Sequence, residues 1–365
     1  MRYGITESFY VVSRESLERC SILLDTIKKC ESHPDVEKLV KSSKESLLAL
    51  QKSILTLMED ETVKDPRFFV NFMIKLSSIV ANLQQIQVEP ITIIKRYDER
   101  DEQKTTLVSK ALHEMNYPFE PPLVVSLKPL DTSCIPKWNI IYTPPCQQEL
   151  LSFFPDILHE VGHIVWYMNQ DILSIDVLNP VKSYFEAKLN EVNTRRRGSR
   201  NLLQSIKKTR ILWEQYWIKE FFSDIFATLV SGASYGWSHF RYSIGAISSI
   251  YSPSNFDDES FHPSDASRMT VISQVLDYLH PDLSPDSVFD HWEFLLDALR
   301  SKGLKEPVTH RVIFPDALLE EIVHISLHHI QQLGILNYVE QFTTKKDCIT
   351  AQARMKWETF QNDIP

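Results

Sequence analysis

The chain has 365 residues, 43% of them hydrophobic, and its 39 Lys and Arg against 48 Asp and Glu give a net charge of −9. This apolar content excludes a globally disordered chain. The acidic balance argues against nucleic acid as a partner, because phosphate binding needs an excess of basic residues. With only 8 glycines against 19 prolines, we expect an α+β protein that is mostly α-helical.

The N-terminus and the cysteines are typical of a cytoplasmic protein. Glu7, Arg14 and Glu15 stand where the apolar region of a signal peptide would have to lie. No run of 18 or more apolar residues occurs, so no membrane span is expected. The five cysteines are odd in number and form no C-x-x-C pair, which favours reduced thiols.

Helical periodicity of apolar residues runs through roughly the first 85 residues. It predicts helices over 16–29, 39–57 and 68–83. We interpret residues 1–105 as a helical module that packs on itself or docks a protein partner. The densely charged stretch 95–106 is predicted to be a solvated linker or a helix end.

Residues 106–365 form the second predicted domain, which opens with a small sheet. Leu123–Leu127 and Trp138–Thr143 are rich in β-branched and aromatic residues and are bounded by prolines, so both are predicted strands. The remainder is predicted to be mainly helical, with a polar loop at 193–200 and an irregular stretch at about 252–264.

The segment His159-Glu160-Val161-Gly162-His163 is an H-E-x-x-H motif. Residues four apart lie on one face of a helix, so both imidazoles can point at one metal ion. Glu160 lies one residue further round, where its carboxylate can accept a proton from a water at the metal. Pro155 and Asp156 suit the first turn of this helix. The competing interpretation is a helix with two partly exposed histidines.

A zinc site needs a third protein ligand. Glu220 and Asp224 lie one helical turn apart among phenylalanines and isoleucine. Such a carboxylate pair is costly to bury without a cation or a hydrogen-bond donor. A metal ligand beside a carboxylate that grips a ligand histidine satisfies both groups. The rival third ligands lack such surroundings; they are Asp171, Asp176, Glu186 and Glu214.

The segments HEVGH and EFFSD resemble the zinc-binding helices of the gluzincin group of metallopeptidases, and the resemblance is limited to these two helices. It implies a zincin-like core, a Zn²⁺ cofactor and a peptide or protein substrate. By this resemblance His159, His163 and Glu220 are the zinc ligands and Glu160 is the general base. Asp224 would orient His159 by accepting its other N–H.

The resemblance also implies a substrate groove beside an edge strand, for which Trp138–Thr143 is the candidate; the alternative for this segment is an ordinary structural strand. A His-Pro segment follows the second helix, and we expect His262 to stabilise the oxyanion, with Arg268 supporting the site. The alternative is a helix N-terminus with Pro263 at its first position. Less specific oxyanion candidates are Tyr235, Tyr242 and Tyr251.

Two further features are expected to be structural. The pair His324 and His328 lacks a neighbouring glutamate and is typical of core or interface histidines. The basic stretch 195–210 is interpreted as a solvated loop. The alternative to a peptidase is a binding or regulatory protein with a degenerate or structural zinc site, which would have four protein ligands.

Overall fold

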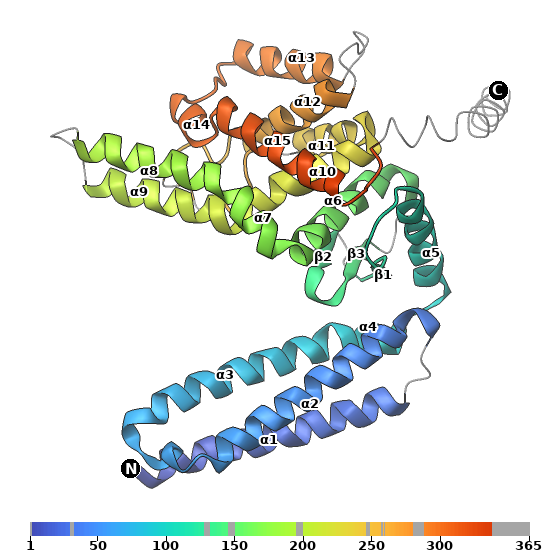
Figure 1. The fold of residues 1–365 in the computed structure, drawn as a ribbon, viewed down its shortest axis with the longest axis vertical. Coiled ribbons are helices and arrows are strands. Elements are labelled where there is room, and N and C mark those ends of the chain that lie inside the picture. Colours follow the sequence, from blue (N-terminus) through green and yellow to red (C-terminus); the bar gives the residue numbers. More distant parts are fainter. Residues whose placement is uncertain are drawn as a thin grey trace. The chain divides into compact units, whose positions relative to one another are not determined.

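The computed structural model describes residues 2–29, 33–127, 132–144, 150–194, 200–245, 249–256, 258, 260–279 and 288–337. These residues are mostly helical, with a small three-stranded sheet (Figure 1). The expected class, α+β and mostly α-helical, is confirmed at this level. In this part of the chain no helix is both long and apolar enough to cross a bilayer.

The chain divides into two compact units. The first comprises residues 1–106 and 123–125, and the second comprises 107–122 and 126–365. In the first unit the long helices α1, α2 and α3 pack on one another (Figure 1). The first-unit helices are α1 (Arg2–Lys29), α2 (Glu37–Glu59), α3 (Pro66–Val88) and α4 (Pro90–Arg96).

The charged stretch 95–106 is mostly helix rather than linker. Helix α4 ends at Arg96, and α5 (Glu99–Glu114) begins three residues later. The side chain of Asp98 accepts hydrogen bonds from the backbone N–H groups of Arg100 and Asp101, which caps the new helix. Acidic residues in its first turn favour this end of the helix dipole, so the charge pattern marks a helix start.

The sheet contains β1 (Leu123–Ser126), β2 (Ser133–Ile135) and β3 (Ile140–Thr143) in the order β1-β3-β2. Strands β2 and β3 are antiparallel, with Cys134 opposite Ile141. The expectation that 138–143 is an edge strand is wrong. All four residues of β3 are buried because it is the central strand, and β2 lies at the edge instead.

Helix α10 is the centre of the second unit. It packs against α6, α11, α12 and α15, and every residue from Phe221 to Val230 is buried, as expected for a largely apolar helix surrounded by other helices. The second-unit helices are α6 (Leu150–Met168), α7 (Gln170–Asp176), α8 (Leu178–Thr194), α9 (Arg200–Leu212), α10 (Ile218–Ser231), α11 (Ala233–Gly245), α12 (Asp265–Leu279), α13 (Val288–Ser301), α14 (Val308–Ile313) and α15 (Asp316–Gln332).

A π-helical turn, Trp213–Trp217, joins α9 to α10 without a break. The N–H of Ile218 donates to the carbonyl of Trp213, five residues back. Such a turn holds one residue more than the same turn of α-helix, which shifts the helix face that follows. Trp213 and Trp217 are both fully packed in the core, so apolar burial holds the turn in place.

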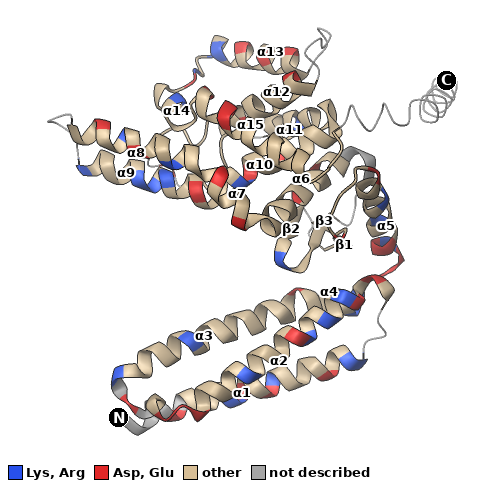
Figure 2. Ribbon diagram, viewed as in Figure 1, with Lys and Arg blue, Asp and Glu red and all other residues tan. Residues whose placement is uncertain are grey.

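The described part of the basic stretch 195–210 is helical and not the expected loop. Residues 195–199 lie outside the described part, and α9 begins at Arg200. Figure 2 shows several Lys and Arg positions along α9. Arg210 pairs with Glu214 at 2.5 Å and with Glu186 at 3.5 Å. Both rival glutamates therefore form ion pairs with Arg210, and neither belongs to the group of ligand atoms around the two histidines of the motif.

Candidate functional site

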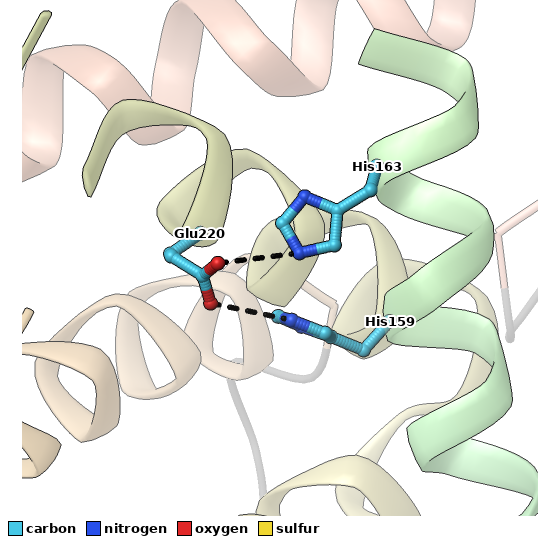
Figure 3. Close-up of side chains that lie close together, drawn as sticks. All are labelled: His159, His163 and Glu220. Atoms are coloured by element: carbon cyan, nitrogen blue, oxygen red, sulfur yellow. Dashed lines mark ion pairs between the residues drawn. The ribbon is translucent and has the colours of Figure 1, made fainter. Parts of the chain in front are cut away.

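Helix α6 presents both histidines of the H-E-x-x-H motif on one face. Their rings lie 4.8 Å apart and are perpendicular, and both side chains point toward Glu220 of α10 (Figure 3). The helix begins at Leu150, so Pro155 lies inside it and not in its first turn as expected. The predicted helix therefore exists but starts earlier than the sequence indicates.

Glu220 places one carboxylate oxygen before each imidazole. Its Oε2 lies 3.5 Å from Nε2 of His159, and its Oε1 lies 3.4 Å from Nε2 of His163. His159, His163 and Glu220, the cavity cluster, each offer one ligand atom, and these atoms lie within 4.8 Å of one another. Burial raises the pKa of Glu220, but the charge of His163 and bonds from the histidines outweigh it and hold this pKa well below its usual value.

The glycine of the motif sets the distance between the two helices. A Cβ atom on Gly162 would lie 2.7 Å from the Cα of Ser223 in α10. Such a contact with backbone cannot be relieved by a side-chain rotation, so only glycine permits this approach. Close packing of α6 on α10 is what brings Glu220 between the histidines.

The other ring nitrogen of His159 is held by buried groups. Nδ1 lies 3.0 Å from Oδ1 of Asp224 and 2.9 Å from the hydroxyl of Tyr235. Arg268 donates to both oxygens of Asp224, at 2.8 and 2.6 Å, and Tyr235 donates to Oδ1 as well. This geometry fits the role expected for Asp224, and Arg268 supports the site through that carboxylate.

This network fixes the charges around His159. Burial opposes the ionised form of Asp224, but Arg268 and His159 hold its pKa well below the usual range. Burial likewise opposes the charged form of His159, but hydrogen bonds to Asp224 and Glu220 raise its pKa to about 10. The ring of His159 therefore lies between two carboxylates, those of Asp224 and Glu220, which both favour its charged form.

The cavity cluster lies in the wall of a cavity of about 1130 Å³. Glu160, half-buried, lines the same cavity. Ser133 and Cys134 of β2 border it, so the strand beside the cavity is β2 and not the expected β3. A molecule in this space would meet the two histidines, Glu220 and Glu160 together.

His262 reaches the cavity cluster from the segment before α12. Its Nδ1 lies 3.4 Å from Oε2 of Glu220, and its side chain is 70% exposed. The bond to Glu220 raises the pKa of His262. Helix α12 begins at Asp265, and the hydroxyl of Ser264 accepts the N–H of Ser267 as its cap. The alternative start with Pro263 at the first helical position is therefore wrong.

Of the remaining candidate residues, some line the cavity and others contact different parts of the second unit. Tyr242 lines the cavity, whereas Tyr251 packs on His310. Asp176 pairs with His329, and His324 is 68% exposed. Within the described ranges, none of the residues in the following list belongs to a group that could hold a metal: Asp171, Asp176, Glu186, Glu214, His324 and His328.

A second group of ligand-type side chains lies in the first unit. His33, Asp35 and Glu102, the N-terminal cluster, also bring one ligand atom each within 4.8 Å. Nε2 of His33 lies 3.4 Å from Glu102, and Nδ1 lies 3.7 Å from the carboxylate of Asp35. No sequence pattern marks this group, because Glu102 is far along the chain from His33 and Asp35.

The cavity wall beyond the cavity cluster was not predicted from the sequence. Asp156, His239 and Asp265 all line it. The available signal was the spacing of Tyr235, His239 and Tyr242, which puts three rings on one face of α11.

No family model, no curated protein and no solved structure matches this chain.

Proposed function

We propose that this chain is a zinc metallopeptidase of the gluzincin type, with a zincin-like core in its second unit. One observation carries the proposal: His159, His163 and Glu220 offer three ligand atoms within 4.8 Å of one another in a cavity wall that also contains Glu160. The likeness to gluzincins in sequence concerns two helices, and these are the helices α6 and α10 that supply the cluster.

The donor set suits Zn²⁺. Two imidazole nitrogens and one carboxylate oxygen are zinc ligands, and three protein ligands with an open position are typical of catalytic rather than structural sites. The Nδ1 atom of His159 is held by Asp224 and Tyr235, which leaves its Nε2 atom directed toward Glu220 and the cavity. Bound zinc would supply a Lewis acid that polarises a carbonyl and makes a water more acidic.

Glu160 would act as the general base. It takes a proton from the attacking water and returns that proton to the nitrogen of the leaving group, so the carboxylate ends each cycle as it began. His262, exposed at the cavity, would donate to the oxygen that gains negative charge during the attack. Asp224, Tyr235 and Arg268 would keep the ring of His159 in one orientation.

The decisive experiment replaces Glu160 by Gln. We expect Glu160→Gln to keep one zinc per chain and to lower peptide hydrolysis by roughly 10²- to 10⁴-fold, measured by metal analysis and by cleavage of a mixed peptide library. Glu320→Gln on the exposed face of α15 is the matched control and should retain activity. Full activity of Glu160→Gln would refute the assignment.

One contact supports a second candidate, a binding protein with a structural zinc. His262 lies 3.4 Å from Glu220 but outside the group of ligand atoms within 4.8 Å of one another; a shift of its ring toward the histidines would make it a fourth ligand, and four protein ligands close a site. His262→Ala separates the two functions. Loss of zinc from this variant would favour the structural site, whereas retained zinc with at least about tenfold slower turnover would favour the peptidase.

A further inference from the structure

A stack of rings runs along α11 from the cavity cluster outward. His159 stacks on Tyr235 with ring centroids 5.8 Å apart, Tyr235 on His239 at 6.4 Å, and His239 on Tyr242 at 6.4 Å. All four residues line the cavity, and Tyr242 is 64% exposed. The stack therefore forms a continuous aromatic wall that begins at a proposed zinc ligand.

Two carboxylates accompany this wall. Asp156 of α6 accepts a hydrogen bond from Ser238, and Asp265 of α12 lies 3.6 Å from Nε2 of His239. Both aspartates line the cavity. Because Ser238 and His239 are neighbours on α11, the two carboxylates approach the same stretch of that helix.

These carboxylates carry negative charge that the protein does not fully compensate. Burial raises the pKa of both Asp156 and Asp265, and Arg241 near the first and Arg268 near the second offset this only in part. Within the described residues Asp265 makes no ion pair with Lys or Arg, and its neighbour Arg268 is held by Asp224. Asp156 has only Arg241 at 3.8 Å, with 53% of that side chain exposed.

A buried nitrogen in the same wall makes no hydrogen bond within the described residues, although Asp265 lies 3.6 Å from it. His239 is 4% exposed, and its Nε2 has no hydrogen bond to any described residue. Burial, with the charge of Arg268 nearby, lowers the pKa of His239 to about 3, so the ring is neutral. A buried polar atom without a partner is uncommon because it costs free energy, and a bound group could complete its bonding.

We propose that this wall binds a cationic side chain of the substrate, so that the enzyme prefers peptides with Lys or Arg close to the cleaved bond. The inference rests on the proposed peptidase function. Asp265 and Asp156 would attract the ammonium or guanidinium group, and the face of Tyr242 would add a cation–π contact. An acidic side chain would be repelled by the same carboxylates.

The test uses internally quenched octapeptides of Ala and Gly with one variable residue at a central position. Lys, norleucine and Glu are compared there, because norleucine keeps the alkyl chain of Lys without its charge. We expect kcat/KM for the Lys peptide to exceed that for norleucine by about tenfold or more. Asp265→Asn should remove most of this preference and leave norleucine turnover within about twofold.

Asp277→Asn is the matched control, because Asp277 lies on the exposed side of the same helix α12. It should keep the preference for Lys. Asp265→Lys should reverse the order and favour the Glu peptide. Turnover without any preference for Lys, or an equal loss for Lys and norleucine in Asp265→Asn, would overturn the cationic subsite and leave the peptidase assignment intact.

Binding of the same peptides, labelled with a fluorophore, is measured by anisotropy on Glu160→Gln protein. Tighter binding of the Lys peptide than of the norleucine peptide supports the subsite. If the wild-type protein binds in this order but cleaves neither peptide, the missing cleavage would refute the proposed function and leave the subsite intact. Equal binding of the Lys, norleucine and Glu peptides would refute the subsite.

Discussion

The cavity cluster and the N-terminal cluster contain the same kinds of side chain in different surroundings. Each holds a histidine beside an aspartate that also accepts a tyrosine hydroxyl: His159 with Asp224 and Tyr235 in one case, and His33 with Asp35 and Tyr97 in the other. In each, a glutamate lies about as far from the histidine, at 3.5 Å and 3.4 Å.

The two clusters differ in burial, and only the cavity cluster contains a second imidazole, that of His163. Asp224 is fully buried and is held by Arg268, whereas the side chains of His33 and Asp35 are each one-third exposed. Nδ1 of His33 accepts the N–H of Asp35 and caps a short 3-10 turn, Pro34–Val36. A partly exposed cluster is adequately stabilised by water and weak ion pairs, so proximity of ligand atoms alone does not indicate a metal site.

The strongest way to break this comparison is to make the same substitution in both clusters. We expect His163→Ala to abolish stoichiometric zinc binding, because only two ligand side chains remain. His33→Ala should leave zinc content unchanged. Metal analysis after dialysis, followed by zinc titration, measures both. Equal loss of zinc from both variants would show that the first unit also holds the ion.

A smaller effect is expected from the contact between helices. Gly162→Ala would force α6 from α10 and should lower the free energy of unfolding by about 1–3 kcal/mol, with weaker zinc binding. Gly245→Ala is the control, because a Cβ there meets nothing within 4 Å. It should raise the free energy of unfolding by about 1 kcal/mol at most, because alanine favours a helix more than glycine does. Thermal unfolding of both proteins provides the measurement. Unaltered zinc affinity in a destabilised Gly162→Ala would contradict the geometric role of this glycine.

The smallest effect is expected from removal of the tyrosine hydroxyl that contacts the aspartate in each cluster. Tyr235→Phe removes a group that holds Nδ1 of His159 and should weaken zinc binding by roughly tenfold, at the low end for residues that orient a ligand. Tyr97→Phe removes the corresponding bond to Asp35 and should change only the stability of the first unit, by about 1 kcal/mol. Competition with a zinc chelator measures the first effect. A Tyr235→Phe protein with wild-type affinity would limit the orienting role to Asp224.

The helices that the sequence predicts best are those with long apolar periodicity. The prediction for 39–57 corresponds to α2, and Pro66 marks the start of α3, as the break before 68–83 indicates. Strand β2 was missed because Ser133, Cys134 and Ile135 show no alternation and owe their conformation to pairing with β3. Of the two alternatives for 95–106, the helix end agrees with the end of α4 at Arg96, whereas the start of α5 could not be placed because its acidic residues also suit a linker.

At the site, spacing was sufficient for residues that act from one helix face. His159 with His163 and Glu220 with Asp224 are each four apart, so each pair could be interpreted locally. Tyr235 and Asp265 reach the cavity from other helices, and their contacts depend on packing around α10. No local pattern separates such residues from ordinary helix residues, so only the folded chain reveals them.

The number of residues in the π-helical turn ahead of α10 determines which way Glu220 and Asp224 point. Each residue of an α-helix advances the side-chain direction by about 100°. Removal of one residue from Trp213–Trp217 would therefore swing Glu220 and Asp224 off the histidines, or else pull the two tryptophans out of the core. A deletion that spares His159, His163 and Glu220 would then disrupt the cavity cluster, and natural variants of this chain that are one residue shorter in this turn should fail to bind the proposed zinc ion.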